Sequence, residues 1–212
     1  MLASRSRGFT LIELMVTLVI AAILLTVGIP SFRDLMIRSQ LSGQVQEFYG
    51  AISFARSEAI KRGNYVTICK SADGSSCGGN TVNWSNGWIV FANNDNDSPA
   101  VRDTSPNVEP LLRVFPTLPS NYTLNPNNNF TNYVTYNRLG MANNLGTFVF
   151  CKDSDEAKAR AIIVTPARPR IATDTDSPAD GIPNIGDGSN ITSCESPLMN
   201  RQVWRSSQSG FS

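Results

Sequence analysis

Histidine is absent from the 212-residue sequence, which removes the commonest general base and a common metal ligand. An enzyme needs a nucleophile with its base, or a paired acid and base. The carboxylates gather in turns, and the four cysteines are expected to be held in disulfides, so the sequence offers no such pair. We therefore expect neither an enzyme nor a bound cofactor.

Net charge is also nearly absent. The 18 Lys and Arg residues against 17 Asp and Glu residues give a net charge of +1. A protein that binds nucleic acid through its overall field is strongly basic. Any nucleic-acid site in this chain must therefore be local.

Charge is almost missing from residues 9–32, where Glu13 is the only charged side chain. The uncharged run 14–32 has 19 residues, just enough to span a bilayer as a helix. Arg5 and Arg7 precede it. A carboxylate in a membrane helix costs about 2.5 kcal/mol or more near the bilayer centre and less near the interface. Glu13 is therefore a candidate functional residue.

Residues 8–13 read Gly-Phe-Thr-Leu-Ile-Glu, which resembles the prepilin cleavage motif of type IV pilins and type II secretion pseudopilins. The resemblance implies that a prepilin peptidase cuts between Gly8 and Phe9 and methylates the new amine of Phe9. It also implies that Glu13 pairs with the N-terminal amine of a neighbouring subunit, which relieves the cost of both charges. The alternative is an ordinary secretory signal, but there the small residue follows the apolar region, whereas Gly8 precedes it.

A second helical pattern follows Pro30, a residue expected to kink or loosen the helix. One apolar stripe recurs every three or four residues, which predicts an amphipathic helix that packs on a sheet. Lys61, Arg62 and Gly63 suit a helix C-terminus. The stripe consists of Ile37, Leu41, Val45, Phe48, Ile52, Ala55 and Ala59.

The rest of the chain predicts short antiparallel strands, rich in Val, Ile, Tyr and Phe and separated by Gly, Asn, Pro and Ser. One face of these strands is expected to lie on the helix stripe, which gives an α+β fold. The expected strands are 65–69, 87–91, 111–115, 122–125, 133–137, 147–151, 161–165 and 170–173.

The order of these elements, with the segment 57–62 (Ser-Glu-Ala-Ile-Lys-Arg), resembles the GspH/FimT/FimU class of minor pilins and pseudopilins. The resemblance implies the type IV pilin fold, a long helix packed on two small antiparallel sheets. Four parts are expected: a cleaved leader 1–8, a transmembrane or fibre-core half-helix 9–34, a globular domain 35–198 that includes the half-helix 35–62, and a disordered tail 199–212. Residues 199–212 also look like the start of a second prepilin leader.

Four cysteines, Cys69, Cys77, Cys151 and Cys194, predict two disulfides in an oxidising compartment. Three pairings are possible. We favour Cys69–Cys77, which closes a short Gly/Ser-rich loop, and Cys151–Cys194, which fastens a long acidic segment. A zinc site is the alternative, but the spacings do not suit paired Cys-x-x-Cys units.

Two oxygen-rich segments could hold a cation. The segment 93–98 lacks the Gly and Glu that an EF-hand loop needs, and an Asn/Asp turn is favoured there. Asp174, Asp176 and Asp180 form a weak calcium candidate, because hard cations prefer several oxygen ligands from a flexible loop. A solvated loop is the favoured interpretation, and we predict no metal.

Arg168 and Arg170 are a candidate phosphate site. On an extended segment two residues apart they point to the same side, and Pro166 and Pro169 stiffen the backbone. The position resembles the Gly-Arg-x-Arg motif with which FimT-type minor pilins capture DNA, except that Ala167 replaces the Gly. Two solvated arginines, or arginines paired with nearby aspartates, remain the favoured interpretation, because phosphate sites usually contain more cations.

Together these features predict a minor pilin of a type IV pilus that helps initiate assembly at or near the tip. The expected partners are other minor and major pilins, through the N-terminal helix, and the prepilin peptidase. The chain is expected to cross the inner membrane once, with its globular domain in the periplasm, and then to enter the fibre. The alternatives are a minor pilin that binds double-stranded DNA through Arg168 and Arg170, and a type II secretion pseudopilin.

Overall fold

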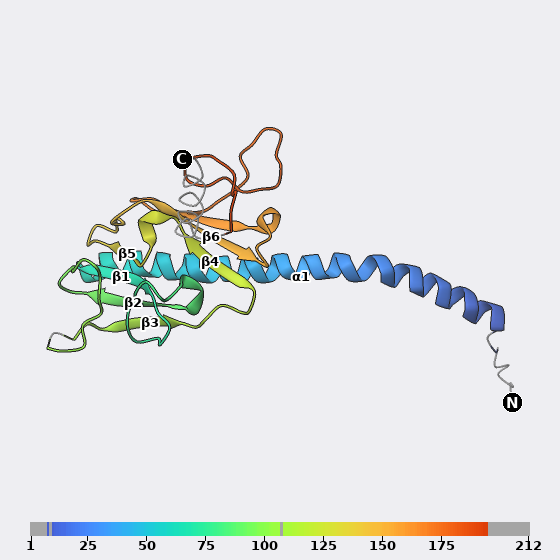
Figure 1. Ribbon diagram of the computed structural model, residues 1–212, viewed down its shortest axis with the longest axis horizontal. Helices are drawn as coiled ribbons and strands as arrows, with labels where there is room; N and C mark the ends of the chain where they lie inside the picture. The colour runs from blue at the N-terminus through green and yellow to red at the C-terminus, as the bar shows by residue number, and fades with distance from the viewer. Residues whose placement is uncertain (1–7, 9, 107, 195–212) are drawn as a thin grey trace, which may run out of the picture. The chain divides into compact units, whose positions relative to one another are not determined.

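The computed structural model describes residues 8, 10–106 and 108–194 (Figure 1). The chain divides into two compact units, one up to Gln40 and one from Leu41, and each is considered by itself. A single helix, α1 (Leu11–Arg62), contributes to both units. Leader residues 1–7, Phe9 and residues 195–212, which include the expected tail 199–212, lie outside the described residues.

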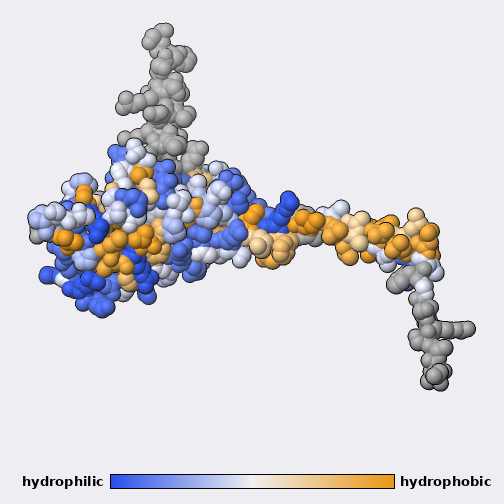
Figure 2. Space-filling model, turned by 90° about the horizontal axis from the view of Figure 1, so that it is seen from below, coloured by the Kyte–Doolittle hydropathy of each residue, from blue (hydrophilic) through white to orange (hydrophobic). Residues whose placement is uncertain are grey.

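From Leu11 to Phe32, the part of α1 in the first unit presents mainly hydrophobic side chains to its surroundings. Leu11, Leu18 and Leu24 are each more than 60% exposed. Figure 2 shows hydrophobic surface along the displayed face of this segment. Its threonine hydroxyls are satisfied within the helix, since Thr17 Oγ1 donates to Leu14 O (2.9 Å) and Thr26 Oγ1 to Ile23 O (2.7 Å). Such internal pairing suits an apolar environment, where an unpaired polar group is costly.

Helix α1 is long and apolar enough near its N-terminus to cross a membrane. It remains helical through Pro30, so the helix does not end at this proline. Whether the axis kinks there, as the sequence predicts, stays a prediction. The uncharged segment that the sequence indicates is therefore part of a continuous helix.

In the second unit, the predicted stripe of α1 is buried from Leu41 to Ala59, with Ala51 added to it, whereas Ile37 is only half-buried. Phe48 is 0% exposed, and its ring meets other aromatic rings edge-on. The centroid distances are 5.8 Å to Trp84, 4.9 Å to Trp88, 4.8 Å to Phe148 and 5.7 Å to Phe150. The stripe is therefore a core face.

Two antiparallel sheets of four strands complete the second unit and pack on the C-terminal half of α1 (Figure 1). One sheet has the order β3-β2-β1-β5 and the other the order β4-β6-β7-β8. The α+β fold and the two small sheets predicted from the sequence are confirmed. The strands are β1 (Tyr65–Lys70), β2 (Trp88–Asn93), β3 (Leu111–Phe115), β4 (Tyr122–Pro126), β5 (Tyr133–Tyr136), β6 (Gly146–Lys152), β7 (Arg160–Val164) and β8 (Pro169–Ile171).

The central strands of each sheet, β1 and β2 in one and β6 and β7 in the other, are buried on both faces. Alternate residues such as Ile68, Phe148 and Ile162 face the core shared with α1. The opposite face of the second sheet carries Cys151 and Ile163, which pack with residues of the segment after β8. Loops thus cover the outer faces of the sheets, which explains why the strand sequences read as nearly continuous apolar runs.

Prolines lie in or beside three of the four edge strands. Pro110 and Pro116 lie on either side of the edge strand β3, Pro126 ends the edge strand β4, and Pro169 begins the edge strand β8. Proline lacks the N–H that a further strand would bond, so these edges resist pairing with other chains.

All eight expected strands are present, but only 111–115 agrees at both ends, and the other boundaries that differ do so by one or two residues. Strand β2 begins at Trp88 rather than at residue 87, because Gly87 has φ 112° and ends a short 3-10 helix. A Cβ at Gly87 would lie 2.7 Å from Phe115 O, so only glycine fits there. Strand β8 is Pro169–Ile171 rather than 170–173, because the chain leaves the sheet after Ile171 to begin the acidic loop.

Candidate functional site

Glu13 lies in the first turn of α1. Thr10, directly before the helix, accepts a hydrogen bond at Oγ1 from Glu13 N (3.2 Å), and Thr10 O accepts from Leu14 N (3.2 Å). Thr10 is thus the N-cap, and Glu13 occupies the third helical position, as in a capping box. The spacing Thr-x-x-Glu in the sequence is a signal for this cap that the motif-based interpretation of Glu13 leaves out.

The position of Glu13 also places a carboxylate at the positive end of the helix dipole. Between Glu13 and Arg33 the helix carries no other charged side chain. Within the described residues Glu13 makes no ion pair, and its neighbours Leu14 and Ile12 are exposed hydrophobic residues. Any positive partner for Glu13 must therefore come from another molecule or from residues outside the described ones. Gly8 is described and exposed, whereas the predicted cleavage partner Phe9 is not described.

Both disulfides have the pairing favoured from the sequence. Cys69 joins Cys77 across a sequence separation of 8, and Cys151 joins Cys194 across a separation of 43. The described residues contain no free cysteine. The longer bridge holds the far end of the segment after β8 against the outer face of the second sheet, where Cys194 and Ile191 are buried.

Arg168 and Arg170 come from the hairpin between β7 and β8. The segment 165–168 is a turn rather than an extended strand, because Thr165 Oγ1 donates to Arg168 O (2.7 Å) and accepts from Arg168 N (3.2 Å). This corrects the expectation that both arginines lie on one extended segment. Arg170 lies in β8 opposite Ile163. Both side chains are exposed, and no carboxylate of the described residues pairs with either guanidinium.

The acidic loop after β8 is organised around the buried side chain of Asn184, which the sequence analysis missed. Asn184 Nδ2 donates to Asp176 Oδ1 (3.1 Å) and to Gly188 O (2.9 Å), and its Oδ1 accepts from the Thr175 hydroxyl (2.8 Å). The carboxylate of Asp174 accepts from Asp176 N (3.0 Å). The three candidate calcium ligands Asp174, Asp176 and Asp180 have carboxylate oxygens within 4.8 Å of one another.

Hydrogen bonds to the loop backbone hold the pKa of Asp174 below its usual value, the largest from Asp176 N and the next from Gly181 N. These bonds are sufficient to account for the ordered carboxylates. The solvated loop stays the favoured interpretation over a calcium site, since acidic groups that bond their own loop need no cation.

The oxygen-rich segment after β2 forms a turn, as predicted. Asn93 Nδ2 donates to Asp97 Oδ1 (3.1 Å), and Asp97 Oδ2 accepts from Val101 N (2.8 Å). Glu109, 1% exposed, accepts hydrogen bonds from Asn94 N and Asp103 N. Burial raises the pKa of Glu109, although these two N–H groups oppose the shift. The Glu109 carboxylate thus holds the loop through these two hydrogen bonds.

Two family models match the sequence. The model described as type II transport protein GspH matches residues 44–167, and the prokaryotic N-terminal methylation motif matches residues 3–29. No protein with a curated description matches the chain.

Among solved structures, the type IV minor pilin FimU of Pseudomonas aeruginosa is similar, with 16% identity and a TM-score of 0.50. That match covers 66% of this chain and 92% of FimU. The minor pseudopilin EpsH from the type 2 secretion system of Vibrio cholerae matches with 10% identity and a TM-score of 0.41 over 65% of this chain and 99% of EpsH. The GspH model spans more than half of the sequence, and the fold agrees with that of FimU. The chain therefore belongs to the GspH family of minor pilins and pseudopilins, with the type IV pilin fold and an N-terminal methylation motif.

Proposed function

We propose that this chain is a minor pilin of a type IV pilus that helps initiate assembly and sits at or near the tip. One observation carries the proposal. The segment of α1 before Arg33 exposes its apolar side chains and holds one carboxylate, Glu13, which pairs with no cation among the described residues. Such a surface is stable only in a lipid bilayer or among similar helices.

Fibre assembly would provide a cover for the apolar side chains of this segment and a positive partner for Glu13. Prepilin peptidase would cut between Gly8 and Phe9 and methylate the new amine, while α1 crosses the inner membrane once with the globular unit in the periplasm. A neighbouring major or minor pilin then packs its helix against this one. The N-terminal amine of one subunit meets Glu13 of another, and the pairing removes two isolated charges from an apolar environment.

The type II secretion pseudopilin is the alternative within the family, and a deletion in the native host separates the two. For a type IV pilin, we expect a strong reduction in surface fibres, with normal amounts of proteins secreted by the type II system. Re-expression of the chain should restore the fibres. Loss of type II secretion with normal fibres would contradict the pilus assignment and support the pseudopilin.

A second candidate function is capture of double-stranded DNA by Arg168 and Arg170. Both guanidinium groups are exposed at one hairpin and pair with no carboxylate of the described residues, so both are available to phosphates. Thr165 fixes the turn that carries Arg168. Two cations form a small site, so the expected binding is weak and strongly dependent on salt.

A salt series with full-length protein in detergent micelles tests DNA binding. If two phosphate contacts are made, Arg168→Ala/Arg170→Ala should weaken binding and lower the slope of log K against log salt by about 2. The matched control is Lys61→Ala/Arg62→Ala, which removes two positive charges at the end of α1. Equal loss in both double variants would point to net charge alone, and unchanged binding in the first would remove the arginines from the site.

A further inference from the structure

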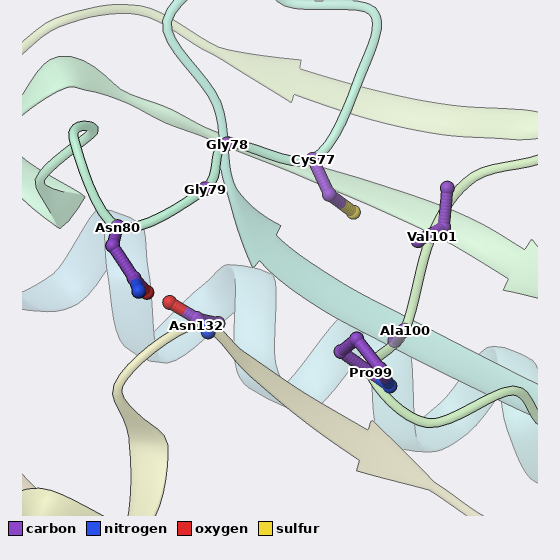
Figure 3. A pocket seen from close by; sticks show the side chains of 8 residues that line it. All are labelled: Cys77, Gly78, Gly79, Asn80, Pro99, Ala100, Val101 and Asn132. Atoms are coloured by element: carbon purple, nitrogen blue, oxygen red, sulfur yellow. The ribbon is translucent and has the colours of Figure 1, made fainter.

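Two adjoining hollows lie on the outer side of the first sheet, and they share Asn132. The larger, about 350 Å³, lies between the loop closed by Cys77 and the segment Pro99–Val101 (Figure 3). The smaller, about 220 Å³, is lined by residues of the segments around β5. Its asparagines are Asn129, Asn132, Asn143 and Asn144.

Asn132 carries a buried acceptor without a donor. Its Oδ1 is shielded from solvent and accepts no hydrogen bond within the described parts of the chain. Buried polar atoms are nearly always paired, so an orphan at the wall of a hollow indicates a missing partner. The side chain of Asn80 points toward Asn132 across the larger hollow (Figure 3), yet no hydrogen bond joins the two. Asn80 is exposed and is free to turn aside.

The described lining of both hollows contains no charged side chain. A charged ligand would lose its hydration there without gaining a counter-charge, which favours a neutral ligand. A carboxamide offers donors and an acceptor side by side, and sugar hydroxyls both donate and accept. Asn143 Oδ1 already accepts from Thr135 N (3.1 Å), and its Nδ2 has no partner within the described structure.

The larger hollow also has an apolar wall beside Asn132. Pro99, Ala100 and Val101 form one side, and Cys77 lies opposite (Figure 3). An acetamido group has a methyl for such a wall and an N–H for a lone carbonyl acceptor. We propose that the two hollows bind a neutral N-acetylated disaccharide. The acetamido N–H of one sugar donates to Asn132 Oδ1 in the larger hollow, and the hydroxyls of the next sugar meet the asparagines of the smaller one.

Titration of the full-length protein tests this assignment, in micelles of a detergent without a sugar headgroup. The probes are di-N-acetylchitobiose and cellobiose, which differ in the acetamido groups. We expect di-N-acetylchitobiose to bind, with saturation transfer from the protein to its acetyl methyl protons, and cellobiose to bind at least tenfold more weakly. Equal affinity for the two disaccharides, or no binding of di-N-acetylchitobiose, would overturn the proposal.

Substitutions at Asn132 and Asn80 test whether the disaccharide binds in these two hollows. Asn132→Ala should lower the affinity for di-N-acetylchitobiose at least tenfold. Asn80→Ala should also change this affinity. The matched control Gln46→Ala removes an exposed carboxamide from α1 and should bind as the wild type does. The Asn132 side chain makes no hydrogen bond in the described structure, so the melting temperature of Asn132→Ala should stay unchanged. Wild-type affinity in Asn132→Ala would contradict the assignment.

Discussion

The two halves of α1 share one backbone conformation but differ in what covers their side chains. Ile20 in the first half is 51% exposed, whereas Phe48 in the second half is 0% exposed. The first half is apolar on every side, and the second is apolar along one stripe. A stripe can be buried within one chain, whereas a helix that is apolar all round needs lipid or other helices. The distribution of apolar residues thus separates the half that is buried within the globular unit from the half that needs lipid or other helices.

The largest expected effect is a loss of stability from a substitution in the second half of α1 that a substitution in the first half does not cause. Phe48→Ala should lower the free energy of unfolding by about 3–5 kcal/mol, because it empties the site between four aromatic rings. Urea unfolding in detergent micelles, followed by tryptophan fluorescence, measures the change. Ile20→Ala is the control and should leave the unfolding midpoint of the globular unit unchanged. Similar losses in both variants would erase the distinction between the halves.

Within the second unit, the two disulfides should differ in how much they contribute to the free energy of unfolding. In the loop-entropy model, removing Cys151–Cys194 costs about 4 kcal/mol and removing Cys69–Cys77 about 2.5 kcal/mol, because the closed loops differ in length. Paired Cys→Ala double variants in the same unfolding assay compare them. A larger loss from the shorter bridge would show that native packing, rather than loop closure, sets the contribution of each.

A smaller, pH-dependent effect is expected at Asp73 in the first disulfide loop. Hydrogen bonds from the Ser76 hydroxyl and from Ser76 N and Ser75 N hold the pKa of Asp73 well below its ordinary range. A lowered pKa in the folded state contributes stability above the unfolded pKa, near 4, and the contribution is lost as pH falls toward the folded pKa.

Asp73→Asn should therefore destabilise the protein at pH 7 by less than about 1 kcal/mol, since the group is exposed and screened by solvent. The difference from the wild type should shrink below about pH 4. Thermal melts at pH 7 and pH 3 measure it. A difference that stays constant across this range would show that the ionised carboxylate is not what fastens the loop.

Periodicity predicted the elements of the fold well because each signal was local. The helix stripe around Phe48 and the β-rich runs around Ile68 and Phe148 correspond to buried faces. The boundary at Gly87 was missed because it depends on the close approach of Phe115 O, a residue distant in sequence. The turn at Thr165 was missed because a side-chain bond to Arg168 replaced the extended backbone expected between two prolines.

The candidate sites were likewise predictable where their residues are contiguous and missed where they come from separate segments. The motif around Glu13 is contiguous and could be read directly, although its cap by Thr10 was overlooked. The sequence around Asn132 and Asn80 does not indicate a binding site, because the two residues line one hollow only through the arrangement of three loops. Asn184 likewise gained its role from the folded acidic loop. Sites assembled from separate segments need the structure.

The most direct test of the account is whether Glu13 is needed for assembly but not for processing. Glu13→Ala is expressed in the native host, with the wild type and Ile20→Ala as controls. Mass spectrometry of the mature N-terminus reports cleavage and methylation, and sheared fibres report incorporation. We expect normal processing of Glu13→Ala, with its amount in fibres reduced at least tenfold, and normal incorporation of Ile20→Ala. Wild-type incorporation of Glu13→Ala would contradict the charge pairing on which the proposed assembly depends.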